Sequence, residues 1–333
     1  MTDNTPVLDV KGLRVDIPTR AGTLHAVRDV SLRVHKGETM CIVGESGCGK
    51  SMTSLALMSL LPKSAKRHTE HFIFQGEDLS RAGKGRINAL RGNKMAMIFQ
   101  EPMTALNPAY TIGDQLTEPY LHHRKSSMAQ ARRRAIDLLE KVGITSAGAR
   151  LGQYPHQLSG GLRQRVMIAM ALMCEPELLI ADEPSTALDV TIQAQILRLL
   201  ADLQKELGLA MMLITHDLGI VARIADRVAV MYAGEIVEEG LTADVFERPS
   251  HPYTRGLIDC IPVPGRTQRG QRLGTIHGVV PSLVGNIQGC GFRDRCPYAQ
   301  PECAHTVPIR SSDSGHRWRC ILAQAPAEHE ATA

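Results

Sequence analysis

The chain has 333 residues, enough for two domains of ordinary size. Its formal net charge of +4 is small and evenly spread, so the composition does not indicate a nucleic-acid partner. No stretch approaches the ~18 apolar residues of a membrane-spanning helix, and the N-terminus lacks the pattern of a secretory signal, which together predict a cytosolic chain.

Strand and helix patterns alternate between residues 8 and 240, which indicates an α/β fold with a mixed sheet at its core. Strands are predicted at residues 8–17, 30–34, 39–43, 95–99, 178–181, 210–215, 227–232 and 235–238. Helices are predicted at residues 51–61, 128–142, 161–173, 191–207 and 218–225.

Three of these elements have clear local patterns. The run from Leu178 to Ala181 is apolar throughout, as a central parallel strand buried on both faces requires. The predicted helix that ends at Leu207 carries apolar residues at helical spacing. The residues from Tyr232 to Glu235 predict a hairpin turn between the last two strands.

A glycine-rich run lies between predicted strand 39–43 and the first predicted helix. It fits the pattern G-x-x-x-x-G-K-[ST], in which glycines let the backbone curl so that N–H groups point at phosphate oxygens. We expect Lys50 to reach the terminal phosphates and the Ser51 hydroxyl to bind Mg²⁺. The predicted nucleotide-binding residues are Gly44, Glu45, Ser46, Gly47, Cys48, Gly49, Lys50 and Ser51.

Polar side chains follow three of the predicted strands. Asp182 and Glu183 follow one of these strands. Asp182 suits water-mediated Mg²⁺ binding, and Glu183 can accept a proton from an attacking water. Gln100 follows another strand, where its amide can reach Mg²⁺ or that water. His216 follows a third and would lie beside the γ-phosphate. We therefore predict Glu183, His216 and Gln100 as catalytic residues.

A second phosphate-binding helix start is predicted within the run Leu158-Ser159-Gly160-Gly161. Ser159 is a good N-cap, and Gly160 and Gly161 expose backbone N–H groups at the beginning of a helix. One nucleotide rarely needs two such sites from one chain. We therefore expect this helix start to bind the nucleotide of a partner subunit.

The order and spacing of these motifs over residues 8–245 resemble the ATP-binding subunits of ABC transporters. The matching pieces are the P-loop from Gly44 to Ser51, the Q-loop at Gln100, the LSGG signature with Ser159, the Walker B acids Asp182 and Glu183, the D-loop from Ser185 to Asp189 and the H-loop at His216. The resemblance implies an ATP-binding domain over residues 1–250, with a helical signature subdomain near 101–165. It also implies that Asp189 contributes to the nucleotide site, and that two ATPase subunits pair head to tail around their ATP molecules.

Two positions depart from the usual pattern of that family. Ile17 and Pro18 occupy the place where an aromatic residue usually stacks on adenine. Cys48 stands where a serine is common. Because Cys48 is near a helix N-terminus, we expect a lowered thiol pKa and an alkylation that inhibits ATPase activity unless ATP protects the site.

Beyond residue 250 the chain is similar to the His-Pro-Tyr extension of oligopeptide and dipeptide importers, in the first of their two ATPase subunits. The matching stretches are Pro249-Ser250-His251-Pro252-Tyr253-Thr254-Arg255-Gly256-Leu257, Pro281-Ser282-Leu283, Gly289-Cys290-Gly291-Phe292, Arg295-Cys296-Pro297, Cys303 and His316-Arg317-Trp318-Arg319-Cys320. We therefore divide the remainder into a small Cys-rich C-terminal domain of residues 251–323 and a disordered tail of residues 324–333.

Four cysteines crowd together in this extension: Cys290, Cys296, Cys303 and Cys320. Their spacing is not the C-x₂-C spacing of zinc ribbons. Four thiolates suit an iron–sulfur cluster or a zinc ion, and the resemblance implies a [4Fe-4S] cluster, while zinc and plain reduced thiols stay open. The segment lacks the apolar periodicity of an independent core, so a bound metal would help it fold.

The resemblance implies an ATPase, dependent on ATP and Mg²⁺, that powers import of di- or oligopeptides as a peripheral subunit on the cytoplasmic face of the inner (plasma) membrane. The implied partners are two membrane permease subunits, a second homologous ATPase subunit and an extracellular or periplasmic substrate-binding protein. The alternatives are a nickel or glutathione importer of the same kind, or a soluble ABC ATPase without a transport role.

Overall fold

The computed structural model describes residues 5–185, 189–261, 274–285 and 287–323. The chain divides into two compact units: residues 1–8, 33–39 and 73–214 in the first, and residues 9–32, 40–72 and 215–333 in the second. Residues 186–188 of the expected D-loop and the expected disordered tail, 324–333, lie outside the described residues.

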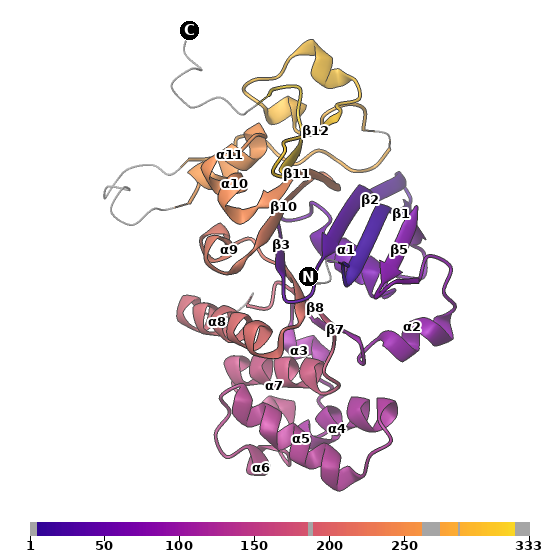
Figure 1. Ribbon diagram of the computed structural model, residues 1–333, viewed down its shortest axis with the longest axis vertical. Helices are drawn as coiled ribbons and strands as arrows, with labels where there is room; N and C mark the ends of the chain where they lie inside the picture. The colour runs from indigo at the N-terminus through magenta and orange to yellow at the C-terminus, as the bar shows by residue number, and fades with distance from the viewer. Residues whose placement is uncertain (1–4, 186–188, 262–273, 286, 324–333) are drawn as a thin grey trace. The chain divides into compact units, whose positions relative to one another are not determined.

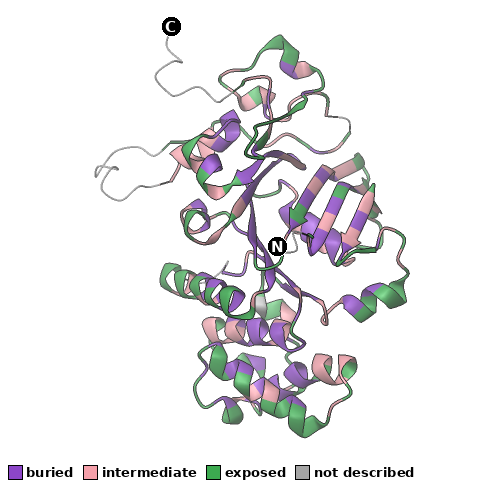
Figure 2. Ribbon diagram, viewed as in Figure 1, coloured by how far each residue is buried: buried purple, intermediate pink, exposed green. Residues whose placement is uncertain are grey.

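The first unit contains three parallel strands, β7 (Met95–Ile98), β8 (Leu178–Asp182) and β9 (Ala210–Ile214). β8 lies between the other two, and every residue of the three strands is buried (Figure 2). The continuous apolar run at Leu178 is therefore confirmed as a central parallel strand, because covered strands have no polar face to present.

Helices make up most of the rest of the first unit. They are α2 (Lys84–Leu90), α3 (Pro102–Ala105), α4 (Ile112–His123), α5 (Met128–Lys141), α6 (Ala147–Arg150), the 3₁₀ turn η1 (Pro155–Gln157), α7 (Gly160–Leu172) and α8 (Val190–Leu207). α7 packs against α3, α4 and α5 (Figure 1). Within the described part of the chain, no helix is both long enough and apolar enough to cross a bilayer.

The helix α4 was missed by the sequence prediction. It begins with a capping box, in which the Thr111 hydroxyl accepts the Asp114 N–H and the Asp114 carboxylate accepts the Thr111 N–H. Gly113 and Pro119 lie inside the helix, and both residues ordinarily weaken a helical prediction. Burial of Leu116 and its neighbours against α5 and α7 outweighs that local preference.

The second unit contains two groups of strands. β1 (Leu8–Thr19) pairs with β2 (Gly22–Val34), β4 (Lys66–His68) and β5 (His71–Phe74). The last two residues of β5 belong to the first unit, where they pair with the short β6 (Glu77–Asp78). β10 (Arg227–Tyr232) pairs with β3 (Thr39–Val43) in parallel and with β11 (Glu235–Leu241) antiparallel. The predicted hairpin is confirmed: Ala233 and Gly234, with φ of 47° and 82°, form its turn.

The C-terminal segment adds two strands to β11. β13 (Arg317–Arg319) pairs with β11, and β12 (Ile309–Ser311) pairs with β13. The helices of the second unit are α1 (Lys50–Leu57), α9 (Leu218–Ile224), α10 (Thr242–Glu247) and α11 (Pro252–Asp259), with the 3₁₀ turns η2 (Arg293–Arg295) and η3 (Pro301–Ala304).

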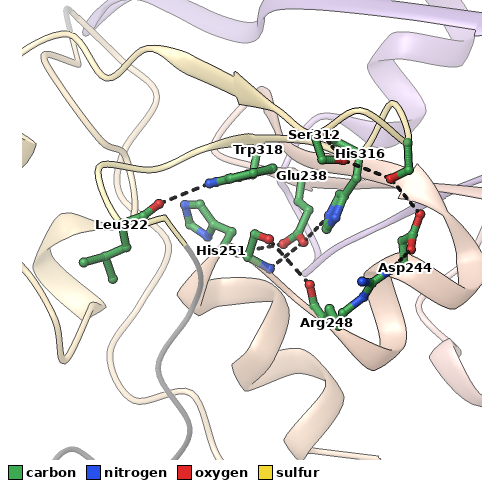
Figure 3. Close-up of polar contacts among 10 residues, drawn as sticks. Glu238, Asp244, Arg248, His251, Ser312, His316, Trp318 and Leu322 are labelled. Atoms are coloured by element: carbon green, nitrogen blue, oxygen red, sulfur yellow. Dashed lines mark hydrogen bonds and ion pairs between the residues drawn. The ribbon is translucent and has the colours of Figure 1, made fainter.

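A buried carboxylate ties this segment to β11. The Glu238 side chain has no exposed surface, and it accepts hydrogen bonds from the N–H groups of Ser250 (2.7 Å) and His251 (2.8 Å). It also accepts one from Nε2 of His316, at 2.7 Å (Figure 3). Three donors from two distant parts of the chain thus converge on one carboxylate, which offsets the cost of burying it.

We expect Glu238→Ala to lower the free energy of unfolding by about 3 kcal/mol or more, because it leaves three buried donors without their acceptor. Urea denaturation followed by circular dichroism measures this. The matched control is Glu247→Ala, whose side chain is exposed on α10, and it should change the unfolding free energy by no more than about 0.5 kcal/mol. Equal effects of the two changes would contradict the role of Glu238.

Candidate nucleotide site

The glycine-rich loop follows the buried strand β3 and ends in the first turn of α1. Gly44 and Gly49 have φ of 152° and 105°, which L-residues rarely adopt. A Cβ atom at Gly44 would lie 2.2 Å from the carbonyl oxygen of Met231, and one at Gly49 would lie 2.4 Å from that of Ala26. Only glycine fits these positions, so the loop has the tight curl that a phosphate cradle requires.

Lys50 is the one charged side chain expected to bind phosphate, and it is 5% exposed. Its ammonium group donates to the loop's own carbonyl oxygens, those of Gly44 at 2.8 Å and Glu45 at 3.0 Å. A phosphate group that enters the loop offers the same ammonium group a charged acceptor, which forms stronger hydrogen bonds than a neutral carbonyl. The position of Lys50 is therefore compatible with its predicted role.

The expected lowering of the Cys48 thiol pKa is wrong. Its side chain has no exposed surface, and burial raises the thiol pKa, although the charge of Lys50 acts in the opposite direction. Desolvation of the thiolate therefore outweighs both Lys50 and the nearby helix start. The thiolate of Cys48 is therefore disfavoured in the folded chain.

In the first unit, the structure brings together Gln100 and Glu183. The Gln100 amide nitrogen donates to a Glu183 carboxylate oxygen at 3.1 Å, which leaves the amide oxygen as the atom that could bind Mg²⁺. Glu183 directly follows β8 and has φ of 44°, while its N–H donates to the carbonyl of Ile214 at 2.9 Å. Such strained backbone concentrates at functional sites, because surrounding structure must hold it in place.

Asp182 is the last residue of β8 and is 4% exposed. His216 is exposed and precedes α9, whose first turn is capped by Asp217 accepting the N–H of Ile220 at 3.1 Å. His216 and the P-loop belong to the second unit, whereas Asp182 and Glu183 belong to the first.

The predicted signature forms the start of α7 in the first unit. Ser159 is confirmed as its N-cap, since the hydroxyl accepts the N–H of Leu162 at 3.4 Å, and Ser159 and Gly160 are exposed. A Cβ atom on Gly161 would lie 3.3 Å from Ile192, in the first turn of α8. Asp189 caps that helix by accepting the N–H of Ile192 at 2.9 Å. The starts of α7 and α8 therefore lie side by side.

The sequence prediction missed two residues that contact the P-loop. Tyr253, in α11, accepts the N–H of Glu45 through its hydroxyl at 2.9 Å. Arg295, in η2, forms a two-bonded ion pair with the Glu45 carboxylate, at 2.6 and 2.9 Å. The His-Pro-Tyr motif marked the first of these residues, but no local pattern links either one to the P-loop.

The four C-terminal cysteines lie near one another. Burial, together with the charges of the neighbouring thiols, raises the pKa of Cys290 and of Cys296 to about 11. The N–H groups of Phe292, Tyr298 and Leu322 donate to the sulfur two residues earlier, an arrangement that favours thiolates. Across the described residues, however, no three His, Cys, Asp or Glu side chains are arranged to hold a metal ion, so the expected metal site is not found.

Comparisons with known proteins extend over nearly the whole chain. Residues 27–186 match the ABC transporter family, and residues 237–303 match the family described as oligopeptide/dipeptide transporter, C-terminal region. The dipeptide transport ATP-binding protein DppD of Bacillus subtilis is 51% identical over 97% of this chain and 96% of its own length. The probable D,D-dipeptide transport ATP-binding protein DdpD of Escherichia coli is 46% identical, with 95% of each chain covered.

Solved structures resemble the chain over a smaller part. A dimeric ATP-binding cassette in a post-hydrolysis state, bound to ADP and Pi, has a TM-score of 0.63 and 26% identity, covering 71% of this chain and 98% of its own. CbiO1 of Clostridium perfringens, part of an ABC transporter complex, has a TM-score of 0.61 and 29% identity, covering 73% of this chain and 91% of its own.

Because burial raises its pKa, Cys48 in the folded chain should resist alkylation by iodoacetamide at pH 7. Raising the pH should increase its reactivity, since the thiolate forms only above the ordinary thiol pKa. Mass spectrometry of the peptide that carries Cys48 measures the modified fraction. The chain unfolded in urea is the control and should be alkylated quickly; equal rates in the two states would restore the idea of a reactive thiol.

Proposed function

The chain belongs to the ATP-binding proteins of ABC transporters, and we propose that it hydrolyses ATP to power the import of di- or oligopeptides across a membrane. The proposal of ATP hydrolysis rests on the contact between Gln100 and Glu183 at the end of a buried strand. Support for the peptide part comes from the match of residues 237–303 and from the transport roles in the names of the relatives.

The P-loop binds the phosphates of ATP. Backbone N–H groups of the loop and the start of α1 face the phosphate oxygens. The Lys50 ammonium group, which donates to the carbonyl oxygens of Gly44 and Glu45, donates instead to the β- and γ-phosphates when ATP binds. A Mg²⁺ ion bound through Ser51, Gln100 and, by way of water, Asp182 would neutralise charge on these oxygens.

Glu183 acts as the general base. It takes a proton from a water molecule as the water oxygen bonds to the γ-phosphorus, and the bond from that phosphorus to the bridging oxygen breaks, releasing ADP and phosphate. Gln100 holds the Glu183 carboxylate by its amide N–H. His216, at the end of the strand β9, stabilises the charge on the γ-phosphate.

A second ATPase subunit completes each site. The start of α7 at Ser159, Gly160 and Gly161 exposes helix N–H groups that would bind the γ-phosphate held by the partner's P-loop. Beside it, Asp189 begins α8, and the next residue, Val190, is 81% exposed although it is apolar. An exposed helix start next to an exposed apolar side chain suits a subunit interface.

Membrane permeases are the second kind of partner, and we propose two of them, served by an external substrate-binding protein. Met103 and Tyr110 are 65% and 56% exposed. Arg163 contacts the Met103 sulfur and donates to the carbonyl of Pro155 at 2.7 Å, which brings the exposed Tyr154 into the same region. The exposed apolar side chains near Arg163 suit a permease at the cytoplasmic face of the membrane, where the chain is a peripheral subunit.

The C-terminal cysteines suit a metal centre in their chemistry, though not in their present arrangement. We propose that Cys290, Cys296, Cys303 and Cys320 bind a [4Fe-4S] cluster, in a small Cys-rich domain of residues 251–323. Four neighbouring sulfurs, three of which accept backbone N–H groups, support this proposal. When bound, the cluster cross-links a segment that has few apolar residues of its own.

Glu183→Gln should bind ATP normally and lower ATP turnover by about 100-fold or more, because the amide cannot accept the proton of the attacking water. Phosphate release by the assembled transporter and equilibrium binding of ATP measure the two effects. Glu177→Gln is the control, since Glu177 lies just before the other end of β8 and pairs with Lys94. Near-normal turnover in Glu183→Gln would refute the base assignment.

Purified without oxygen, the chain should be brown and contain about four iron atoms if the cluster is bound. Iron and zinc analysis with visible absorption spectroscopy measures this. Cys303→Ser should lose the metal, whereas Cys260→Ser, a change at the end of α11 outside the cysteine group, should keep it. A colourless chain with one zinc ion would refute the cluster, and a chain without metal would refute the metal centre.

A further inference from the structure

An ion pair joins the C-terminal segment to the P-loop. The Arg295 guanidinium donates from Nη1 to one Glu45 carboxylate oxygen at 2.6 Å and from Nη2 to the other at 2.9 Å. The Arg295 side chain is 4% exposed and that of Glu45 is 29% exposed. Two parallel bonds of this kind restrict both distance and orientation, which a single bond to a lysine could not do.

The environment of Arg295 holds the guanidinium in one position. Nε donates to the carbonyl of His277 at 2.9 Å, Nη2 to that of Ile276 at 3.1 Å, and Nη1 to the hydroxyl of Tyr232 at 3.2 Å. Together with the two bonds to Glu45, all five N–H donors have acceptors. The guanidinium carbon also lies 5.7 Å and 5.8 Å from the ring centroids of Tyr232 and Phe292.

The same segment of the P-loop is held at its backbone. The hydroxyl of Tyr253 accepts the Glu45 N–H, and the Tyr253 ring lies 4.6 Å from the Tyr232 ring and 5.3 Å from that of Phe292. Tyr232, Tyr253 and Phe292 are buried. Glu45 is therefore held through both its backbone and its side chain by residues that follow the ATP-binding motifs in the sequence.

Glu45 is an acidic residue inside a loop that binds phosphates. An ionised carboxylate close to the triphosphate repels it, and repulsion between charges is strong where the surroundings are partly desolvated. Arg295 neutralises this carboxylate and fixes its place. The loop thus keeps an acidic side chain without the electrostatic cost to nucleotide binding.

We propose that Arg295 is a positioning residue for ATP binding, which acts by neutralising and orienting Glu45 of the P-loop. This inference rests on the proposed function, since it requires the P-loop to bind ATP. It assigns to the C-terminal segment a part in the nucleotide site that acts through Glu45, in addition to any role in binding metal.

Three variants of the full chain test this inference through equilibrium binding of ATP and through ATPase kinetics of the assembled transporter. Arg295→Gln should raise the Kd and the KM for ATP on the order of tenfold, with little change in kcat, because Glu45 is left ionised and unpaired. Glu45→Gln should bind ATP more tightly than the wild type, because the loop loses a negative charge while Arg295 keeps its positive one. The double variant should recover most of the affinity that Arg295→Gln loses.

The control is Arg293→Gln, which makes the same chemical change two residues earlier in η2, where the side chain is 39% exposed and pairs with Asp294. It should leave the Kd for ATP within about twofold of the wild type. A merely structural role predicts instead that Glu45→Gln weakens binding as much as Arg295→Gln and that the double variant recovers nothing. Either of those results overturns the proposal, and Glu45→Gln alone decides it if Arg295→Gln does not fold.

ATP binding by the wild type and by Lys50→Ala separates the proposed function from the role of Arg295. If the wild-type chain does not bind ATP, or if Lys50→Ala binds it as well as the wild type, the proposed function itself is wrong. If ATP binding requires Lys50 but is unaffected by Arg295→Gln, only the role of Arg295 is refuted.

Discussion

The second unit depends on a close approach of backbone to backbone around the P-loop. At Gly44 the chain meets the carbonyl of Met231 in β10, and at Gly49 it meets the carbonyl of Ala26 in β2. The turn of the β10–β11 hairpin closes the same region, since the Gly234 N–H donates to the Cys48 carbonyl at 2.9 Å. A side chain at either glycine would separate these strands from the loop, so its curl and the surrounding strands form together.

The C-terminal segment is built into this arrangement. Glu238 joins β11 to the turn before α11 and to His316, and Arg295 reaches the P-loop carboxylate of Glu45. Both contacts involve charged groups that are mostly buried and have several partners. Such contacts resist rearrangement because a buried charge that loses its partner is strongly destabilising. The segment is therefore attached by its pairing with β11, by the buried carboxylate of Glu238 and by the contact with the P-loop.

Much of the fold and of the candidate site could be predicted from the sequence where one local pattern decided the outcome. The apolar run at Leu178, the hairpin at Gly234 and the N-cap at Ser159 depend on residues close together in the chain, and all three are present. The thiol pKa of Cys48 was predicted in the wrong direction, because it depends on burial, which the nearby sequence does not reveal. The helix α4 was missed because its stability comes from packing against α5 and α7.

By itself, the sequence determined the motifs of the ATP-binding site and their order, since each motif is a short run whose chemistry follows from residue type and spacing. Only the tertiary structure decided that Gln100 contacts Glu183, and that Tyr253 and Arg295 hold Glu45. Those pairs are 83, 208 and 250 residues apart in the sequence. Contacts across such distances depend on how the strands and helices pack, and no local propensity encodes them.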